Sequence, residues 1–216
     1  MDIIWYGHSS FKLFEKGLAS VITDPYDAQT TGNPPLKVQG NIVTISHNQP
    51  GHNYVAAVSG NPFVISGPGE YEIGGVFITG LQTNGHNSLV DVKDRNTMYA
   101  YDFDGIKVAH LGAIDRLPNQ SEVEELGNVH ILIVPIGGNN TLNAIKAAEI
   151  INLFEPNIVI PMHYMTESSI IKLEPLNKFL KEMGLSAVEA LDSFKVTSPR
   201  NLPEETQVVV LEAHNK

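Results

Sequence analysis

Short runs of Val, Ile and Leu, separated by polar loops, dominate the hydrophobic pattern of the chain. Each run is four to six residues long and is bounded by Gly, Pro, Asn or a charged residue, a pattern typical of buried β-strands. Five runs carry the pattern most clearly: Ala19–Thr23, Asn41–Ser46, Gly105–Ala109, His130–Val134 and Asn157–Met162. These runs predict a protein built around β-sheets.

Weaker patterns predict further strands. Ser10–Glu15 and Val76–Gly80 are expected to be antiparallel neighbours, and Gln207–Leu211 to be the last strand. Met98–Phe103 precedes Asp104-Gly105, a pair that favours the tight turn of a hairpin.

Helices are predicted mainly in the second half of the chain. Thr141 is the expected N-cap of a helix whose apolar stripe runs to Leu153. A second helix is expected over Ser168–Met183, interrupted by Pro175, and a short one over Ser121–Leu126. Strands first, then strands alternating with helices, indicate two packed sheets with helices outside.

Composition narrows the possible classes of protein. The chain has 216 residues, 42% hydrophobic and 18% charged, which is typical of a globular protein, and we expect one domain over residues 1–216. The net charge of -10 disfavours nucleic acid as a partner. With no cysteine, no signal-like start and no apolar run of the ~20 residues that span a bilayer, we expect a cytoplasmic protein without a membrane partner.

Histidines follow the predicted strands in a repeated pattern. His47, His110 and His163 each stand where an apolar run stops, and His52 lies five residues after His47. Imidazole is the commonest protein ligand for transition metals, and loops at one sheet edge converge on a common point. A lone histidine at such a place is more often a hydrogen-bonded loop residue, so the pattern alone leaves both interpretations open.

Four stretches in order resemble the metallo-β-lactamase superfamily, in the branch of zinc-dependent hydrolases similar to ascorbate-phosphate lactonase. They read Trp5-Tyr6-Gly7-His8-Ser9-Ser10-Phe11, Gly67-Pro68-Gly69-Glu70-Tyr71-Glu72-Ile73-Gly74-Gly75-Val76, Pro135-Ile136-Gly137-Gly138 and Val159-Ile160-Pro161-Met162-His163-Tyr164. The resemblance implies an α/β fold, an αββα four-layer sandwich of two mixed β-sheets flanked by helices, with the site at one edge.

The metal-binding motif of that family is incomplete here. The family pattern His-x-His-x-Asp-His corresponds to His47–His52, where Gln49 and Gly51 replace the middle His and the Asp. The family pattern His-x-Gly-Asp ends in Ala113, so the bridging carboxylate is missing too. Without acidic ligands, two divalent ions would repel each other strongly, and we expect at most one metal.

The resemblance assigns roles to the remaining residues. The metal ligands it implies are listed here: His47, His52, His110 and His163. Zinc, or another divalent transition metal, is the expected cofactor. Asp24 and His86 are the candidate catalytic residues, each a possible base in place of the missing Asp, and Gln49 or Asp115 could replace a lost ligand.

Two functions remain open from the sequence. The first is a metal-dependent hydrolase of a small ester, lactone or phosphorylated metabolite, with reduced or altered activity. The second is a catalytically inactive relative that binds a ligand or a protein at the same edge. A small-molecule partner is expected in the first case, and a homo-oligomer is possible in both.

Overall fold

The fold is built on two large β-sheets. The computed structural model describes residues 1–83 and 95–214. The first sheet has the strand order β15-β1-β2-β3-β5-β7. Its strands are β1 (Asp2–Gly7), β2 (Ser10–Phe14), β3 (Val21–Thr23), β5 (Ile42–Thr44), β7 (Phe63–Ile65) and β15 (Phe194–Lys195). β1, β2 and β3 are antiparallel neighbours, whereas β3, β5 and β7 run parallel.

The second sheet has the order β16-β13-β12-β11-β10-β9-β8. Its strands are β8 (Gly69–Ile73), β9 (Val76–Thr83), β10 (Asn96–Phe103), β11 (Ile106–His110), β12 (Ile131–Pro135), β13 (Ile158–Met162) and β16 (Gln207–Val208). The predicted hairpin is present, since β10 and β11 pair antiparallel and Asp104 and Gly105 both have positive φ. β11, β12 and β13 run parallel, so their carboxyl ends reach the same edge.

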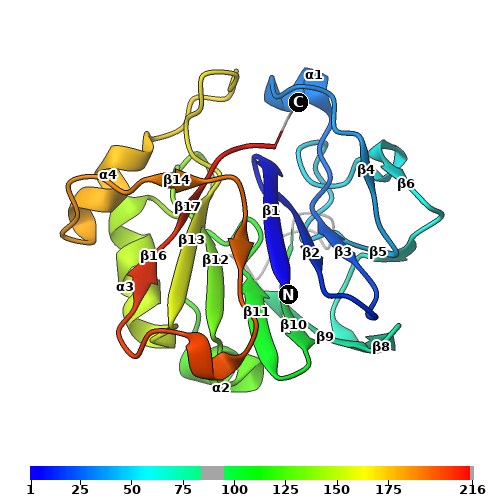
Figure 1. Cartoon of the computed structure of the whole chain (residues 1–216). Coiled ribbons are helices and arrows are strands. Elements are labelled where there is room, and N and C mark those ends of the chain that lie inside the picture. Colours follow the sequence, from blue (N-terminus) through cyan, green and yellow to red (C-terminus); the bar gives the residue numbers. More distant parts are fainter. Residues whose placement is uncertain (84–94, 215–216) are drawn as a thin grey trace.

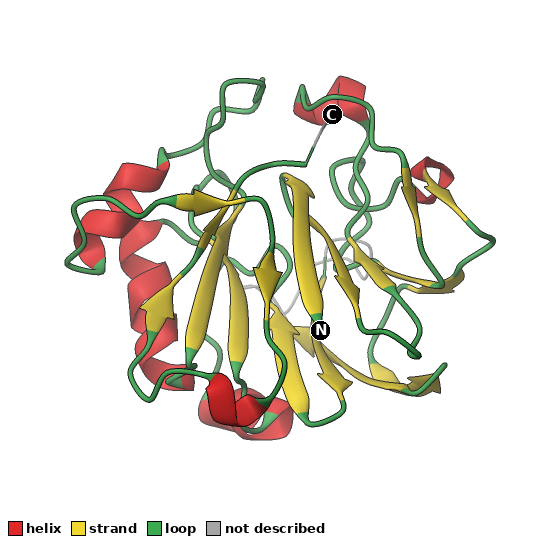
Figure 2. Ribbon diagram, viewed as in Figure 1, coloured by secondary structure: helices red, strands yellow, loops and turns green. Residues whose placement is uncertain are grey.

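Helices lie outside the sheets, as Figures 1 and 2 show. α3 (Ala144–Phe154) and α4 (Leu176–Glu182) cover the outer side of the second sheet, with α2 (Gln120–Leu126) at its lower end. On the other side lie α1 (Ala28–Thr31), a 3-10 turn (Val55–Ala57) and the pair β4 (Val38–Gln39) and β6 (Val58–Ser59). Shorter elements complete the chain: β14 (Ala190–Leu191), β17 (Val210–Leu211) and a 3-10 turn (Pro199–Asn201). The expected sandwich of two sheets flanked by helices is confirmed.

The core lies between the sheets because their strands bury the apolar runs seen in the sequence. β1 alternates, with Ile3 and Trp5 buried and their neighbours partly exposed, whereas every residue of β12 and β13 is buried. Alternation is expected where one face packs on the core, and full burial where both faces are covered. β1 therefore packs one face on the core between the sheets, whereas β12 and β13 are covered on both faces.

Four predictions differ from the structure. Ser10–Glu15 and Val76–Gly80 are not neighbours, because β2 lies in the first sheet and β9 in the second. Asn143, not Thr141, caps α3, because its side chain accepts a hydrogen bond from the Lys146 N–H. Residues 168–175 are not helical, and α4 begins only after Pro175, whose ring disfavours helix in the residue before it. The last predicted strand is split into β16 and β17, which pair with different strands.

No helix in the described ranges is both long and apolar enough to cross a lipid bilayer.

Candidate metal centre

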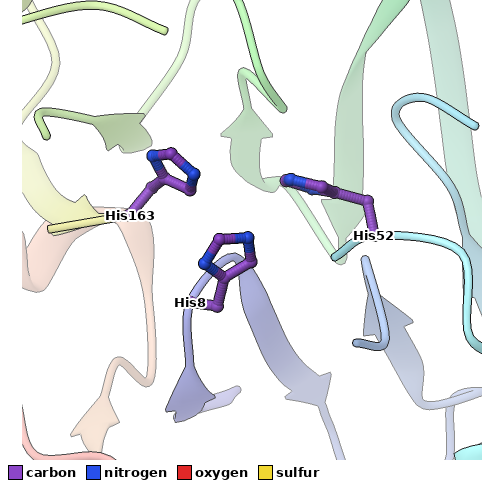
Figure 3. Close-up of side chains that lie close together, drawn as sticks. All are labelled: His8, His52 and His163. Carbon is purple, nitrogen blue, oxygen red and sulfur yellow. The ribbon is translucent and has the colours of Figure 1, made fainter. Parts of the chain in front are cut away.

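Three histidines meet at the edge where the two sheets adjoin, as Figure 3 shows. His8 follows β1, His52 lies in the loop after β5, and His163 follows β13. One ring nitrogen from each lies within 4.8 Å of the other two. The ring centroids of His8 are 4.4 Å from His163 and 4.9 Å from His52. All three side chains are buried, so the fold brings three imidazoles together out of contact with bulk solvent.

The backbone at this centre is held in an uncommon conformation. His8, Asp24 and His163 have φ values of 52°, 38° and 52°, in the left-handed region that residues with a side chain seldom adopt. The His163 N–H donates to the His8 carbonyl oxygen at 3.1 Å, which ties the ends of β1 and β13 together. A Cβ on Gly137 would collide with the His163 carbonyl oxygen, so only glycine fits there. Such strain is typical of functional sites.

Asp24 holds His52 in place. Its carboxylate accepts hydrogen bonds from the Ser46 backbone N–H at 2.7 Å, from the Ser46 hydroxyl at 2.5 Å, and from His52 Nδ1 at 2.8 Å. The bond from Nδ1 leaves His52 Nε2 free to face the other imidazoles. A carboxylate that orients an imidazole from behind is the usual outer partner of a metal-bound histidine.

The electrostatics favour neutral imidazoles. Burial lowers the pKa of His8 and of His52 well below the usual value, and the neighbouring histidines lower both further. Burial, with His47 nearby, lowers the pKa of His163 to about 4. A metal ion binds the neutral form of imidazole. These directions fit a metal centre, since protonated imidazoles cannot bind a metal ion.

His47 lies beside the three-histidine group. Its ring centroid is 4.2 Å from that of His52, and the side chain is partly exposed. The Ser46 hydroxyl is 3.5 Å from His47 Nδ1. His47 therefore stands at the rim of the buried centre, in contact with one of its members.

His110 is turned away from this centre. Its side chain is fully buried, Nε2 lies 3.0 Å from the Ser9 carbonyl oxygen, and Nδ1 accepts a hydrogen bond from the Gly112 N–H at 3.2 Å. Both ring nitrogens are thus occupied by the backbone, and burial lowers the pKa of this ring. Of the four predicted ligands, the structure gathers His52 and His163, places His47 alongside, and engages His110 elsewhere. The ligand assignment itself stays a prediction.

A cavity of about 430 Å³ opens onto the three-histidine group. Its lining includes His8, His47, His52 and His163, together with the three positions where the family motif is altered, which are Gln49, Gly51 and Ala113. Asp115 is the one acidic residue among the described lining residues. His86, a predicted catalytic residue, lies outside the described residues.

His8 is the candidate ligand that the sequence pattern did not predict. The run Asp2–Gly7 is not among the strands predicted from the sequence. It is nevertheless apolar and is followed by a histidine, as are the runs before His47 and His163. The same strand-then-histidine pattern would have identified it.

Comparison with known proteins agrees with the fold. The family model of the β-lactamase superfamily domain matches residues 2–163. A predicted zinc-dependent hydrolase of the metallo-β-lactamase superfamily from Thermotoga maritima superposes with a TM-score of 0.80 at 34% identity, covering 97% of each chain.

Sequence relatives give the same picture. A UPF0173 metal-dependent hydrolase of Thermoplasma volcanium is 28% identical over 82% of this chain and 88% of its own, and a UPF0173 protein of Pyrococcus furiosus is 31% identical over 78% and 85%. This chain belongs to the metallo-β-lactamase superfamily. Within that superfamily it is similar to proteins named metal-dependent hydrolases.

Proposed function

We propose that this protein is a hydrolase with one divalent transition metal, zinc first among the candidates, held by His8, His52 and His163. The observation that carries the proposal is the group of three buried imidazoles with nitrogens within 4.8 Å, at the wall of a cavity of about 430 Å³. The substrate class that we propose is a small ester, lactone or phosphorylated metabolite.

The residues present fit one zinc-like ion. Three neutral imidazoles are a donor set that zinc accepts in catalytic sites, with a fourth position left for water. This chain lacks the two carboxylates of the family motif that would offset the repulsion of two ions, since Gly51 and Ala113 stand at those positions. The donor set therefore supports one ion instead of two.

The chemistry divides between the centre and its surroundings. When bound, a zinc-like ion supplies a Lewis acid and lowers the pKa of a water molecule toward ~7. Asp24 keeps its hydrogen bonds to Ser46 and His52, so its part is to position His52 and not to accept a proton from water. Among the described residues that line the cavity, His47 is the imidazole outside the three-nitrogen group, and its partly exposed ring would serve as a proton acceptor there.

Elemental analysis tests the proposal directly. Untagged protein is incubated with zinc, manganese or nickel, and the metal that remains after desalting is counted. We expect about one ion per chain in the wild type, lost in His8→Ala and His163→Ala and kept in His214→Ala, a change of an exposed histidine. Hydrolysis is then assayed with aryl acetates, lactones and p-nitrophenyl phosphate.

Metal content near zero under all three conditions would refute the proposal. That result would favour the second function, a catalytically inactive relative that binds a ligand or a protein. One ion per chain without hydrolysis of any substrate class would support the metal centre and contradict the substrate classes.

A further inference from the structure

A second cavity of about 700 Å³ adjoins the metal centre. His47 lines both cavities, so its side chain stands at the border between them. The described residues that line the second cavity include several with side chains able to form hydrogen bonds with a ligand, among them Asn48, Asn53, Ser66, Gln82, Arg95 and Thr97. A molecule held in the second cavity would therefore have its other end close to His47 and the three-histidine group.

The pairing of β9 and β10 fixes which residues face each cavity. Asn96 pairs with Thr83, and both line the first cavity, whereas Thr97 pairs with Gln82, and both line the second. Side chains alternate between the faces of a strand, so Arg95 shares a side with Thr97. The end of this two-stranded ribbon thus presents Arg95 to the second cavity and Asn96 to the first.

The charge of the second cavity is unusual for this molecule. The chain as a whole carries a net charge of -10, yet no Asp or Glu is among the described residues that line this cavity. Arg95 brings a positively charged guanidinium to the cavity. Around it stand amides and hydroxyls, which are hydrogen-bonding groups without negative charge. A guanidinium among neutral polar groups is suited to a phosphate or a carboxylate.

We propose that Arg95 binds an anionic oxygen-bearing group, a phosphate or a carboxylate, of the substrate whose reacting bond lies at the three-histidine group. This inference rests on the proposed function and narrows its substrate class to anionic small molecules. Arg95 would act as a specificity-determining residue. It contacts the distant anionic end of the substrate, while His8, His52 and His163 remain near the reacting bond.

Phosphate binding tests the site itself. Zinc-loaded protein is titrated calorimetrically with inorganic phosphate and, separately, with acetate, to tell the two anions apart. Four proteins are compared: wild type, Arg95→Gln, His163→Ala, and the control Arg200→Gln, which changes an exposed arginine in a 3-10 turn. Loss of one charge-assisted contact is worth ~1.5 kcal/mol or more, so we expect the affinity to fall about tenfold in Arg95→Gln.

The outcomes separate the possibilities. A fall in Arg95→Gln, with Arg200→Gln unchanged, supports the proposal whether or not His163→Ala also binds more weakly. Unchanged affinity in Arg95→Gln, with a fall in His163→Ala, means that the anion binds the metal alone and overturns it. Absence of measurable binding of both anions overturns it as well.

Kinetics provide a second readout once a hydrolysed ester is found. For matched aryl esters that differ in one carboxylate, Arg95→Gln should raise KM about tenfold for the anionic ester and leave the neutral ester unchanged. Equal effects on both esters would contradict a specificity role. Because phosphate binding does not require turnover, loss of hydrolysis in every variant would count against the proposed function and not against the Arg95 site.

Discussion

His8 Nε2 lies 3.0 Å from the point where a side chain on Gly51 would begin. Position 51 is the place where the resemblance to the family motif leads us to expect an acidic ligand, and this chain has Gly there. The imidazole of His8 therefore occupies space next to the missing side chain, and glycine at 51 leaves room for it. Glycine at position 51 and the place of His8 in the centre are therefore linked, because a side chain at 51 would press on the His8 ring.

Gly51→Ala is expected to weaken metal binding about tenfold, the lower end of the effect of disturbing a ligand's surroundings. The added methyl would push His8 while offering no new ligand atom. The measurement is a competition titration against a zinc chelator, with unfolding monitored in parallel. In a metal-free His8→Ala background the same change should leave the free energy of unfolding unchanged, whereas in the metal-free wild type it should lower it. An equal loss of stability in both backgrounds would contradict the contact.

His110→Ala is expected to destabilise the protein but to leave its metal content near one. The change leaves the Ser9 carbonyl and the Gly112 N–H without their buried partner and opens a cavity, at a cost of roughly 3 kcal/mol. Urea unfolding and elemental analysis of the same sample separate the two effects. Folded His110→Ala without metal would establish His110 as a ligand after all.

Asp24→Asn is expected to lower metal affinity about 10- to 100-fold. An amide cannot accept all the hydrogen bonds that the carboxylate receives from Ser46 and His52, so the ring of His52 would lose its fixed orientation. Ser46→Ala removes only the hydroxyl donor and serves as the graded control, with an intermediate affinity. If both variants bind metal like the wild type, Asp24 does not position a ligand.

Acid is expected to destabilise the metal-free protein through its buried histidines. The folded pKa of His163 is about 4, below the ordinary value of 6.5, so the unfolded chain binds more protons at pH 5 than the folded chain does. The stability is fully present above about pH 6.5 and is lost as pH falls toward 4. His163 alone should contribute about 2 kcal/mol of loss between pH 8 and pH 5.

Urea unfolding of metal-free wild type and His163→Ala at pH 8 and pH 5 measures this loss. The variant should lose about 2 kcal/mol less than the wild type over the same interval, since it lacks the buried ring. An equal loss in the two proteins would mean that His163 is not buried in the neutral form.

The strands before His47, His110 and His163 could be predicted because each one buries an apolar run between polar loops. Their bounds agree with the predicted runs to within two residues at each end. The Asp104-Gly105 turn was equally readable, because few residues adopt its backbone conformation. Helix boundaries were less accurate, since Asn143 and Thr141 are both good caps and only packing chooses between them.

The candidate centre was predicted only in part. A strand that ends at a histidine places its Cα near the site, but the direction of the ring depends on partners elsewhere in the chain. His110 fits the pattern and yet points to the Ser9 carbonyl oxygen, 101 residues away in sequence. His8 was not predicted because the strand before it, Asp2–Gly7, is not among the predicted strands. Its proximity to Gly51 depends on the folded structure and cannot be seen in the sequence.

The hydrogen bond from the His163 N–H to the His8 carbonyl oxygen joins the two sheets at the candidate centre. His8 and His52 belong to the segment that forms the first sheet, whereas His163 follows a strand of the second. The three candidate ligands therefore cannot come together until the chain has been synthesised past residue 163 and its two sheets have docked. Metal loading of this protein would be a late step of its maturation. The bound ion would link the first sheet to the second through residues that are synthesised at different times.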